Sequence, residues 1–284
     1  MIHSLRRLYS IIGILFFSLS FISCKKETIP SYIYIDKINL STDYATQGST
    51  ASKFTDAWVY IDDQPIGTFE LPATFPVLSS GQHEVEIRGG IKVDGIASTR
   101  AQYPFCNFCI QTANLQTGST INITPTVKYF PAIKFEWLED FENVGVSITR
   151  ASGSDTSLHF VTNNSLVFEG KKSGAVFLDS SHTYFECLST NSYELPYSVD
   201  VYLELNYSCN NSFAVGVYSS GSSTPYTTMY VNPTNNQWNK IYINLINEIN
   251  TSYSPPYTIF ISMQQDSGVD LPVLYLDNIK LLHQ

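Results

Sequence analysis

Alternation of apolar and polar residues with a period of two runs through most of the chain after residue 30 and predicts β-strands. Between residues 31 and 130 these runs are short and are separated by turn residues. The dipeptide Asp94-Gly95 predicts a tight turn in which both residues take positive φ. The runs expected to form strands are 32–40, 57–61, 85–87, 91–93 and 121–127. This region therefore predicts a first β-sandwich.

The same alternation resumes after residue 133 and continues to the end of the chain. Pro125 and Pro131 mark the junction, because proline cannot donate a hydrogen bond to a strand ladder. The connection is only a few residues long, so we expect the two domains to adopt a limited range of orientations. The predicted fold class is all-β, with two β-sandwich domains at 31–130 and 133–284.

The first 30 residues follow a different pattern. Arg6 and Arg7 precede an apolar run, 8–21, which has the length of a signal peptide and is too short for a comfortable membrane span. The sequence Phe21-Ile22-Ser23-Cys24 follows. It resembles the lipobox of bacterial lipoproteins, although Phe21 replaces the more usual Leu. The alternative is an ordinary secretory signal with an incidental cysteine.

The lipobox resemblance implies that a signal peptide, 1–23, is removed and that Cys24 is acylated, with residues 24–30 as a tether. Two or three acyl chains make a stable membrane anchor. Asp is absent from the position after Cys24, which favours the outer membrane, and Lys25-Lys26-Glu27 weakly resembles the surface-export signal of Bacteroidetes lipoproteins. The periplasmic and cell-surface sides both stay open.

Charge excludes some classes of partner. The chain has 16 basic and 25 acidic residues, and removal of Arg6 and Arg7 with the signal leaves 14 basic residues, for a net charge of about −11. Such a surface does not attract nucleic acid or anionic lipid headgroups. After the signal, no apolar run is long enough to cross a bilayer.

Four cysteines remain if Cys24 is acylated, in a compartment that permits disulfides. Cys106 and Cys109 form a CxxC pair, and Cys187 and Cys209 lie in neighbouring strand-like segments. Both are possible disulfides. Zinc and redox chemistry at the CxxC are the weaker alternatives. No second pair and no nearby His completes a zinc ligand set, and the segment is strand-like, whereas a redox motif needs a helix N-terminus.

Two resemblances indicate the type of each domain. The run Trp58-Val-Tyr-Ile-Asp-Asp63, with Leu71-Pro72 and Val85-Glu-Ile87, resembles Ig-like or PEGA-type β-domains of bacterial exported proteins, which usually act as spacers. The second domain opens with Glu139-Asp-Phe-Glu142 and closes with Leu274-Tyr-Leu-Asp277-Asn. Its order of motifs resembles the jelly-roll of carbohydrate-binding modules and galactose-binding-like proteins.

The jelly-roll resemblance implies two kinds of site. The family often holds a structural calcium between its opening and closing strands, which here implies Glu142 and Asp277 as ligands; the alternative is a solvated Glu142 and an Asp277 that accepts backbone hydrogen bonds. Sugar binding needs exposed aromatic faces beside polar side chains. The aromatic candidates are Tyr226, Tyr230, Tyr253 and Tyr257, and the polar candidates are Asn232, Asn235, Asn236 and Gln237. We expect Trp238 to be a core residue.

No catalytic constellation is evident. The acids Glu136, Glu139, Asp140 and Glu142 do not have the E-x-D-x-x-E register of laminarinase-like enzymes, and G-x-S-x-G, H-E-x-x-H and P-loop motifs are missing. The sequence therefore predicts a non-catalytic outer-membrane lipoprotein that binds glycan or another surface ligand. The alternatives are a structural or assembly protein with an envelope protein as partner and, less favoured, a glycan-active enzyme.

The lipid anchor is testable at Cys24. We expect the wild-type protein to carry acyl chains at its N-terminus and to enter the detergent phase in phase partitioning, because several buried chains outweigh the solubility of the attached domains. Cys24→Ser should carry none and stay in the aqueous phase. Mass spectrometry of the N-terminal peptide distinguishes the two, and an unmodified Cys24 in the wild-type protein would contradict the prediction.

Overall fold

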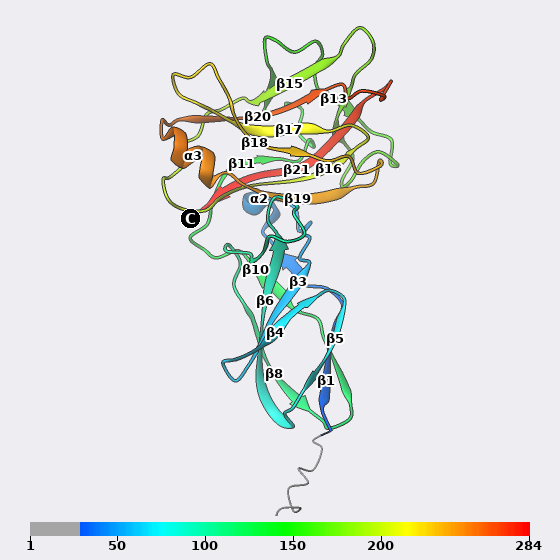
Figure 1. Ribbon diagram of the computed structural model, residues 1–284, viewed down its shortest axis with the longest axis vertical. Helices are drawn as coiled ribbons and strands as arrows, with labels where there is room; N and C mark the ends of the chain where they lie inside the picture. The colour runs from blue at the N-terminus through cyan, green and yellow to red at the C-terminus, as the bar shows by residue number, and fades with distance from the viewer. Residues whose placement is uncertain (1–28) are drawn as a thin grey trace, which may run out of the picture.

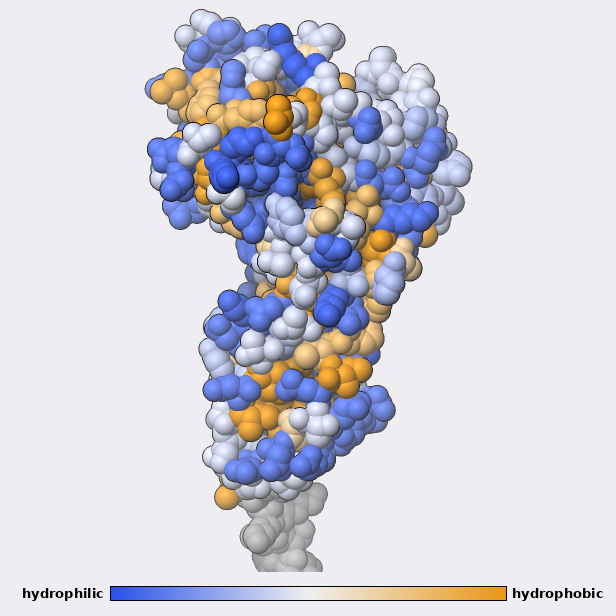
Figure 2. Space-filling model, turned by 180° about the vertical axis from the view of Figure 1, so that it is seen from behind, coloured by the Kyte–Doolittle hydropathy of each residue, from blue (hydrophilic) through white to orange (hydrophobic). Residues whose placement is uncertain are grey.

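The computed structural model describes residues 29–284 and contains two β-sandwiches stacked along the long axis, with a narrow waist between them (Figures 1 and 2). The predicted signal peptide, Cys24 and most of the predicted tether lie outside the described residues. Within 29–284, no helix is both long enough and apolar enough to span a membrane. The all-β fold with two sandwiches is confirmed.

The N-terminal sandwich has one three-stranded sheet in the order β5-β1-β9, a two-stranded pair β10-β2, and a sheet in the order β4-β3-β6, with β7 and β8 both beside β6. A single-turn helix, α2, follows β2. The strands are β1 (Ser31–Ile35), β2 (Asn39–Ser41), β3 (Asp56–Ile61), β4 (Gln64–Glu70), β5 (Ala73–Val77), β6 (Gly81–Lys92), β7 (Arg100–Gln102), β8 (Cys109–Leu115), β9 (Thr120–Ile123) and β10 (Thr126–Lys128), and α2 is Tyr44–Gln47.

Alternation explains these strands: in β1 the side chains of Ile33 and Ile35 are buried, whereas that of Tyr34 between them is half-buried. The predicted turn after β6 is confirmed, since Asp94 and Gly95 have φ of 55° and 68°. This turn begins a longer loop to β7 and carries Asp94 to the other domain. There its backbone N–H donates to the carbonyl oxygen of Tyr242 at 2.8 Å.

The C-terminal sandwich consists of two sheets, in the orders β13-β14-β21-β16-β19 and β12-β15-β20-β17-β18. The opening strand β11 pairs directly with the closing strand β21. The elements are β11 (Lys134–Glu139), β12 (Ile148–Arg150), β13 (His159–Val161), β14 (Ser173–Phe177), β15 (Tyr184–Ser189), β16 (Val201–Cys209), β17 (Phe213–Ser219), β18 (Tyr226–Val231), β19 (Asn239–Asn244), α3 (Ile246–Ser252), β20 (Tyr257–Gln264) and β21 (Val273–His283).

The two sandwiches share one apolar cluster. Tyr202, Tyr242 and Leu282 of the C-terminal domain pack into the core of the N-terminal domain. Tyr103 of the N-terminal domain lies among them, with its ring centroid 5.9 Å from that of Tyr202 and 5.1 Å from that of Tyr242. The domains are therefore docked through a continuous core, and the short connection between β10 and β11 is only part of what holds them.

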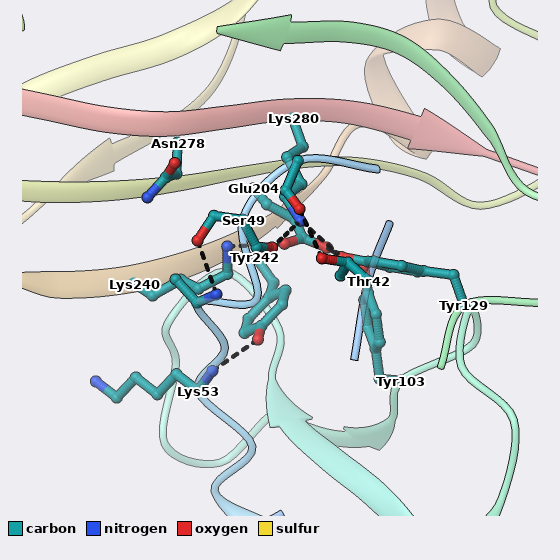
Figure 3. Close-up of polar contacts among 12 residues, drawn as sticks. Thr42, Ser49, Lys53, Tyr103, Tyr129, Glu204, Lys240, Tyr242, Asn278 and Lys280 are labelled. Carbon is teal, nitrogen blue, oxygen red and sulfur yellow. Dashed lines mark hydrogen bonds and ion pairs between the residues drawn. The ribbon is translucent and has the colours of Figure 1, made fainter. Parts of the chain in front are cut away.

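A buried polar network lies at the centre of this junction (Figure 3). Glu204, on β16, is fully buried, and its Oε2 lies 2.8 Å from Nζ of Lys240. The hydroxyls of Tyr103 and Tyr129, both from the N-terminal domain, donate to Glu204 Oε1. Lys280 donates from Nζ to the Ser49 carbonyl oxygen at 2.6 Å. Both domains thus supply partners for charges that lie out of contact with water.

The charges in this network depend on one another. Burial would raise the pKa of Glu204, but Lys240 and Lys280 outweigh it and hold that pKa below its ordinary value. Burial lowers the pKa of Lys280 to about 8, against the opposing effect of Glu204. Glu204 is thus the main carboxylate that balances two buried ammonium groups, with a smaller effect of Glu169 on Lys280, and we expect the junction to depend on Glu204.

Glu204→Gln tests this dependence. Gln can still accept the tyrosine hydrogen bonds, but Lys240 and Lys280 lose their counter-charge, so we expect a loss of about 3–5 kcal/mol in the free energy of unfolding, as for other broken buried pairs. Urea denaturation measures it. The control is Glu70→Gln. It removes one exposed carboxylate, which pairs with both Lys92 and Arg100, and should change stability little. Equal effects of the two substitutions would contradict the prediction.

Candidate functional site

A groove of about 860 Å³ lies at the junction and takes its walls from both domains. The N-terminal domain contributes the segment before β3 and the turn after β6. The C-terminal domain contributes β18, β19 and the loop between them. The principal lining residues are Lys53, Lys92 and Asp94 on one side and Tyr230, Asn232, Gln237, Trp238 and Asn239 on the other.

Tyr230 is the most exposed aromatic residue of the groove, with 71% of its surface accessible. In a regular strand Tyr226 and Tyr230 would point to the same side. In β18, however, the pairing with β17 skips Thr228, and this β-bulge reverses the alternation. Tyr226 and Met229 therefore pack against the core, whereas Tyr230 points outward.

Gly216, opposite the bulge, is what lets the two strands approach this closely. A Cβ atom on Gly216 would lie 2.1 Å from the Tyr226 carbonyl oxygen, so no other residue fits there without moving the strand. The outward direction of Tyr230 is thus built into the packing of β17 against β18.

Trp238 lies on the same side of the groove as Tyr230. The prediction that it is a core residue is wrong: it is half-buried and absent from the core cluster. Its ring packs on Phe168, at 5.3 Å between centroids, and on Tyr275, at 6.3 Å. Trp238 lies just before β19, at the end of a loop, so strand alternation does not determine which way its side chain points. The contacts with Phe168 and Tyr275 hold the indole in place instead.

The loop 232–238 carries the amides of the groove. Asn235 and Asn236 have positive φ, 52° and 60°, and turn the chain. The loop is fixed to β16, because the backbone N–H of Thr234 donates to the Cys209 carbonyl oxygen at 2.9 Å and its hydroxyl accepts from the Cys209 N–H at 3.0 Å. Asn232 and Gln237 line the groove and are exposed, whereas Asn235 and Asn236 do not line it.

The other predicted tyrosines lie elsewhere. Tyr253 is 58% exposed and packs edge-to-face on Tyr197 at 4.9 Å, at the end of α3 and outside the groove. Tyr257 as a ligand-binding residue is a wrong prediction. Its side chain is fully buried on the same face of β20 as Ile259 and Ile261, and its hydroxyl donates to the Ile249 carbonyl oxygen at 3.1 Å. It has no ring face to offer a ligand.

The acids weighed for catalysis make structural hydrogen bonds. Glu139 is buried, and its two oxygens accept from the backbone N–H groups of Phe141 and Ser147 at 2.8 and 2.6 Å. Asp140 accepts from the hydroxyl of Tyr44, and Glu136 lies 3.1 Å from His283. In the groove itself, Asp94 is the one carboxylate among the lining residues that the structure describes.

Glu142 and Asp277, the predicted calcium ligands, lie on either side of the loop 169–173. Glu142 Oε1 accepts from the N–H groups of Lys171 and Lys172, both at 2.8 Å. Asp277 is buried, its two oxygens accept from Ser173 and from the Asn278 N–H, and burial raises its pKa to about 7. Three of these four carboxylate oxygens therefore already accept protein hydrogen bonds. No cluster of three or more His, Cys, Asp or Glu suited to a metal occurs in 29–284.

Neither predicted disulfide is formed, and the four described cysteines are free thiols. Cys187 lies on β15 and Cys209 on β16, which belong to opposite sheets although they follow one another in the sequence. Cys106 points into the core, and burial raises its pKa, whereas Cys109 is partly exposed at the start of β8. Neighbouring strand-like segments in the sequence did not become neighbouring strands of one sheet.

Comparison with known proteins gives structural matches alone. No protein-family model matches the chain. No curated protein matches it either.

Among similar solved structures is a family 61 carbohydrate-binding module in complex with β-1,4-galactotriose, 17% identical, with 48% of this chain and 87% of that one covered and a TM-score of 0.33. Another is the CBM22-1 and GH10 modules of Clostridium thermocellum endo-1,4-β-D-xylanase 10B complexed with xylohexaose, at 13% identity, coverages of 53% and 28% and a TM-score of 0.38. A family 29 carbohydrate-binding module is 10% identical, with 53% of this chain and 88% of that one covered and a TM-score of 0.36. Scores this low assign no function.

Calcium binding by Glu142 and Asp277 stays a prediction, and melting temperatures test it. If calcium binds there, saturation at about 100 times the dissociation constant should stabilise the protein by about 2.7 kcal/mol, and EDTA should remove the effect. Glu142→Gln should abolish the calcium response. Equal melting temperatures of the wild-type protein in calcium and in EDTA would contradict the prediction.

Proposed function

We propose that this protein is a lipid-anchored outer-membrane protein that binds a glycan, without cleaving it, in the groove at the domain junction. The observation that supports this best is the exposed ring of Tyr230 in the same groove as the half-buried ring of Trp238. A sugar ring stacks its CH groups on such aromatic faces.

The groove has the other features that a sugar needs. Its volume of about 860 Å³ falls in the usual range for ligand sites, about 300–1,000 Å³. The side-chain amides of Asn232 and Gln237 offer both donors and acceptors for hydroxyl groups. Because the loop that carries Asn232 and Gln237 is tied to β16, these groups are held in place before a ligand arrives.

A non-catalytic role agrees with the charges in the groove. Hydrolysis of a glycosidic bond needs two carboxyl groups about 5–9.5 Å apart, on the two sides of the bond. Among the described lining residues the groove has Asp94 alone. Asp94 Oδ1 also accepts the backbone N–H of Asn244 at 2.9 Å, which gives this carboxylate a structural task.

The position of the groove suits an anchor at Cys24. β1 begins at the end of the molecule that is farthest from the C-terminal sandwich (Figure 1). A lipid attached a few residues before β1 would leave the N-terminal sandwich between the membrane and the groove. This arrangement would present the groove to ligands away from the bilayer.

A second candidate, attachment to an envelope protein, is favoured by the edge of the N-terminal domain. β8 pairs with β6 and with no other strand of the described sheets. Ile110, on β8, is 54% exposed and Phe108 just before it is 38% exposed. Figure 2, which views the molecule from behind, also shows apolar residues at the surface of the N-terminal domain. An open edge with apolar side chains is a typical place for strand addition by a partner.

A glycan array followed by calorimetry tests the proposed function. We expect binding to at least one glycan, and a loss of affinity of about tenfold or more for Tyr230→Ala or Trp238→Ala, because buried aromatic contacts dominate binding energies.

Tyr253→Ala is the matched control, since it removes an exposed tyrosine outside the groove and should leave binding unchanged. Binding that is lost in Tyr253→Ala and kept in Tyr230→Ala would place the site near α3 and overturn the proposal for the groove. A silent array, together with a protein partner that β8 substitutions release, would favour the second candidate.

A further inference from the structure

The groove at the junction carries an excess of positive charge, whereas the chain as a whole is acidic. Of the nineteen lining residues three are lysines and one is an acid. The whole chain, by contrast, has 16 basic and 25 acidic residues. Lys240 is matched by Glu204, which leaves Lys53 and Lys92 as the cations that face a ligand.

Lys53 has a fixed position and a neutral partner. Its backbone N–H donates to the Tyr242 hydroxyl at 2.8 Å, which holds this segment against the other domain. Its ammonium group donates to the Asn239 side-chain oxygen, and no carboxylate lies within ion-pair distance of it among the described residues. Burial lowers the pKa of Lys53, and repulsion by the ammonium group of Lys92 lowers it further.

The nearby acids do not cancel this charge. Lys92 lies 3.2 Å from Glu70, but Glu70 is exposed and is shared with Arg100 at 2.9 Å. Asp94 is held by the Asn244 N–H, and burial raises its pKa. An anion placed between Lys53 and Lys92 would relieve their repulsion and gain two charge-assisted hydrogen bonds.

We infer that the ligand is an anionic glycan, whose carboxylate or sulfate groups bind Lys53 and Lys92 while its sugar rings stack on Tyr230 and Trp238. This inference rests on the proposed function. The net negative charge of the chain does not oppose it at physiological salt. The screening length there is about 8 Å, so lysines in contact with the ligand outweigh acids farther away.

Calorimetry of the purified full-length protein with three ligands, two of them a matched charged and neutral pair, tests the inference. The ligands are an oligogalacturonate, the same oligosaccharide as its neutral methyl ester, and a sulfated galactan. We expect at least one charged ligand to bind about tenfold or more tightly than the ester, and its affinity to fall with added salt. Loss of galactan binding in the lysine variants would show that the lysines accept sulfate as well as carboxylate.

Lys53→Gln with Lys92→Gln should remove this preference for charge, so that the charged ligands bind no more tightly than the ester. Lys53→Arg should keep it, and Lys128→Gln, at an exposed lysine outside the groove, is the control. Equal affinity for charged and neutral ligands, with no effect of the lysine substitutions, would overturn the inference and leave the proposed function intact. No binding of any glycan would overturn both.

Discussion

The relative position of the two sandwiches depends on the contacts of the buried Glu204 carboxylate with Lys240 and with two tyrosines of the other domain. A charge buried without a partner costs several kcal/mol, so Glu204 requires Lys240 beside it and the hydroxyls of Tyr103 and Tyr129 from the other domain. These partners come together in one relative position of the two sandwiches. The surrounding apolar cluster, with Tyr202 and Tyr242, excludes the water that would otherwise make the carboxylate independent of the N-terminal domain.

The groove exists because the junction is fixed. Lys53 and Asp94 belong to one sandwich, and Tyr230 and Trp238 belong to the other. If the domains moved freely, these side chains would not form one surface, and a ligand would have to order the domains when it bound. The N-terminal sandwich, expected from its resemblance to be a spacer, thus supplies one wall of the candidate site.

Carboxylates that accept hydrogen bonds also hold the loop 169–173, although only Asp277 among them is buried. Glu142 and Asp277 hold the loop 169–173 through its N–H groups and the Ser173 hydroxyl. Glu169, from this loop, accepts from the hydroxyl of Ser49 in the N-terminal domain and from Asn278 at 2.9 Å. Glu142 and Asp277, the predicted metal ligands, thus hold the loop, and Glu169 connects the loop to the closing strand and to the other domain.

The sequence by itself determined the local structure. Alternation predicts strands such as β1 and β20 because successive side chains of a strand point to opposite sides, and Asp94-Gly95 predicts its turn because both residues tolerate positive φ. The order of these strands was sufficient for the all-β class with two sandwiches. The polar loop 232–238 was also recognisable as a possible ligand site, since amides and aromatics lie close together in the sequence.

Only the tertiary structure decided which of these residues meet. Leu203-Glu204-Leu205 has the pattern of a half-exposed strand, yet every residue of β16 is buried, because the N-terminal domain covers the face that carries Glu204. The side to which Tyr230 points depends on a bulge in the pairing of β18 with β17. Cys187 and Cys209 lie in different sheets although their strands follow one another in the sequence. Strand alternation follows from local backbone geometry, whereas burial, register and contact depend on segments far away in the chain.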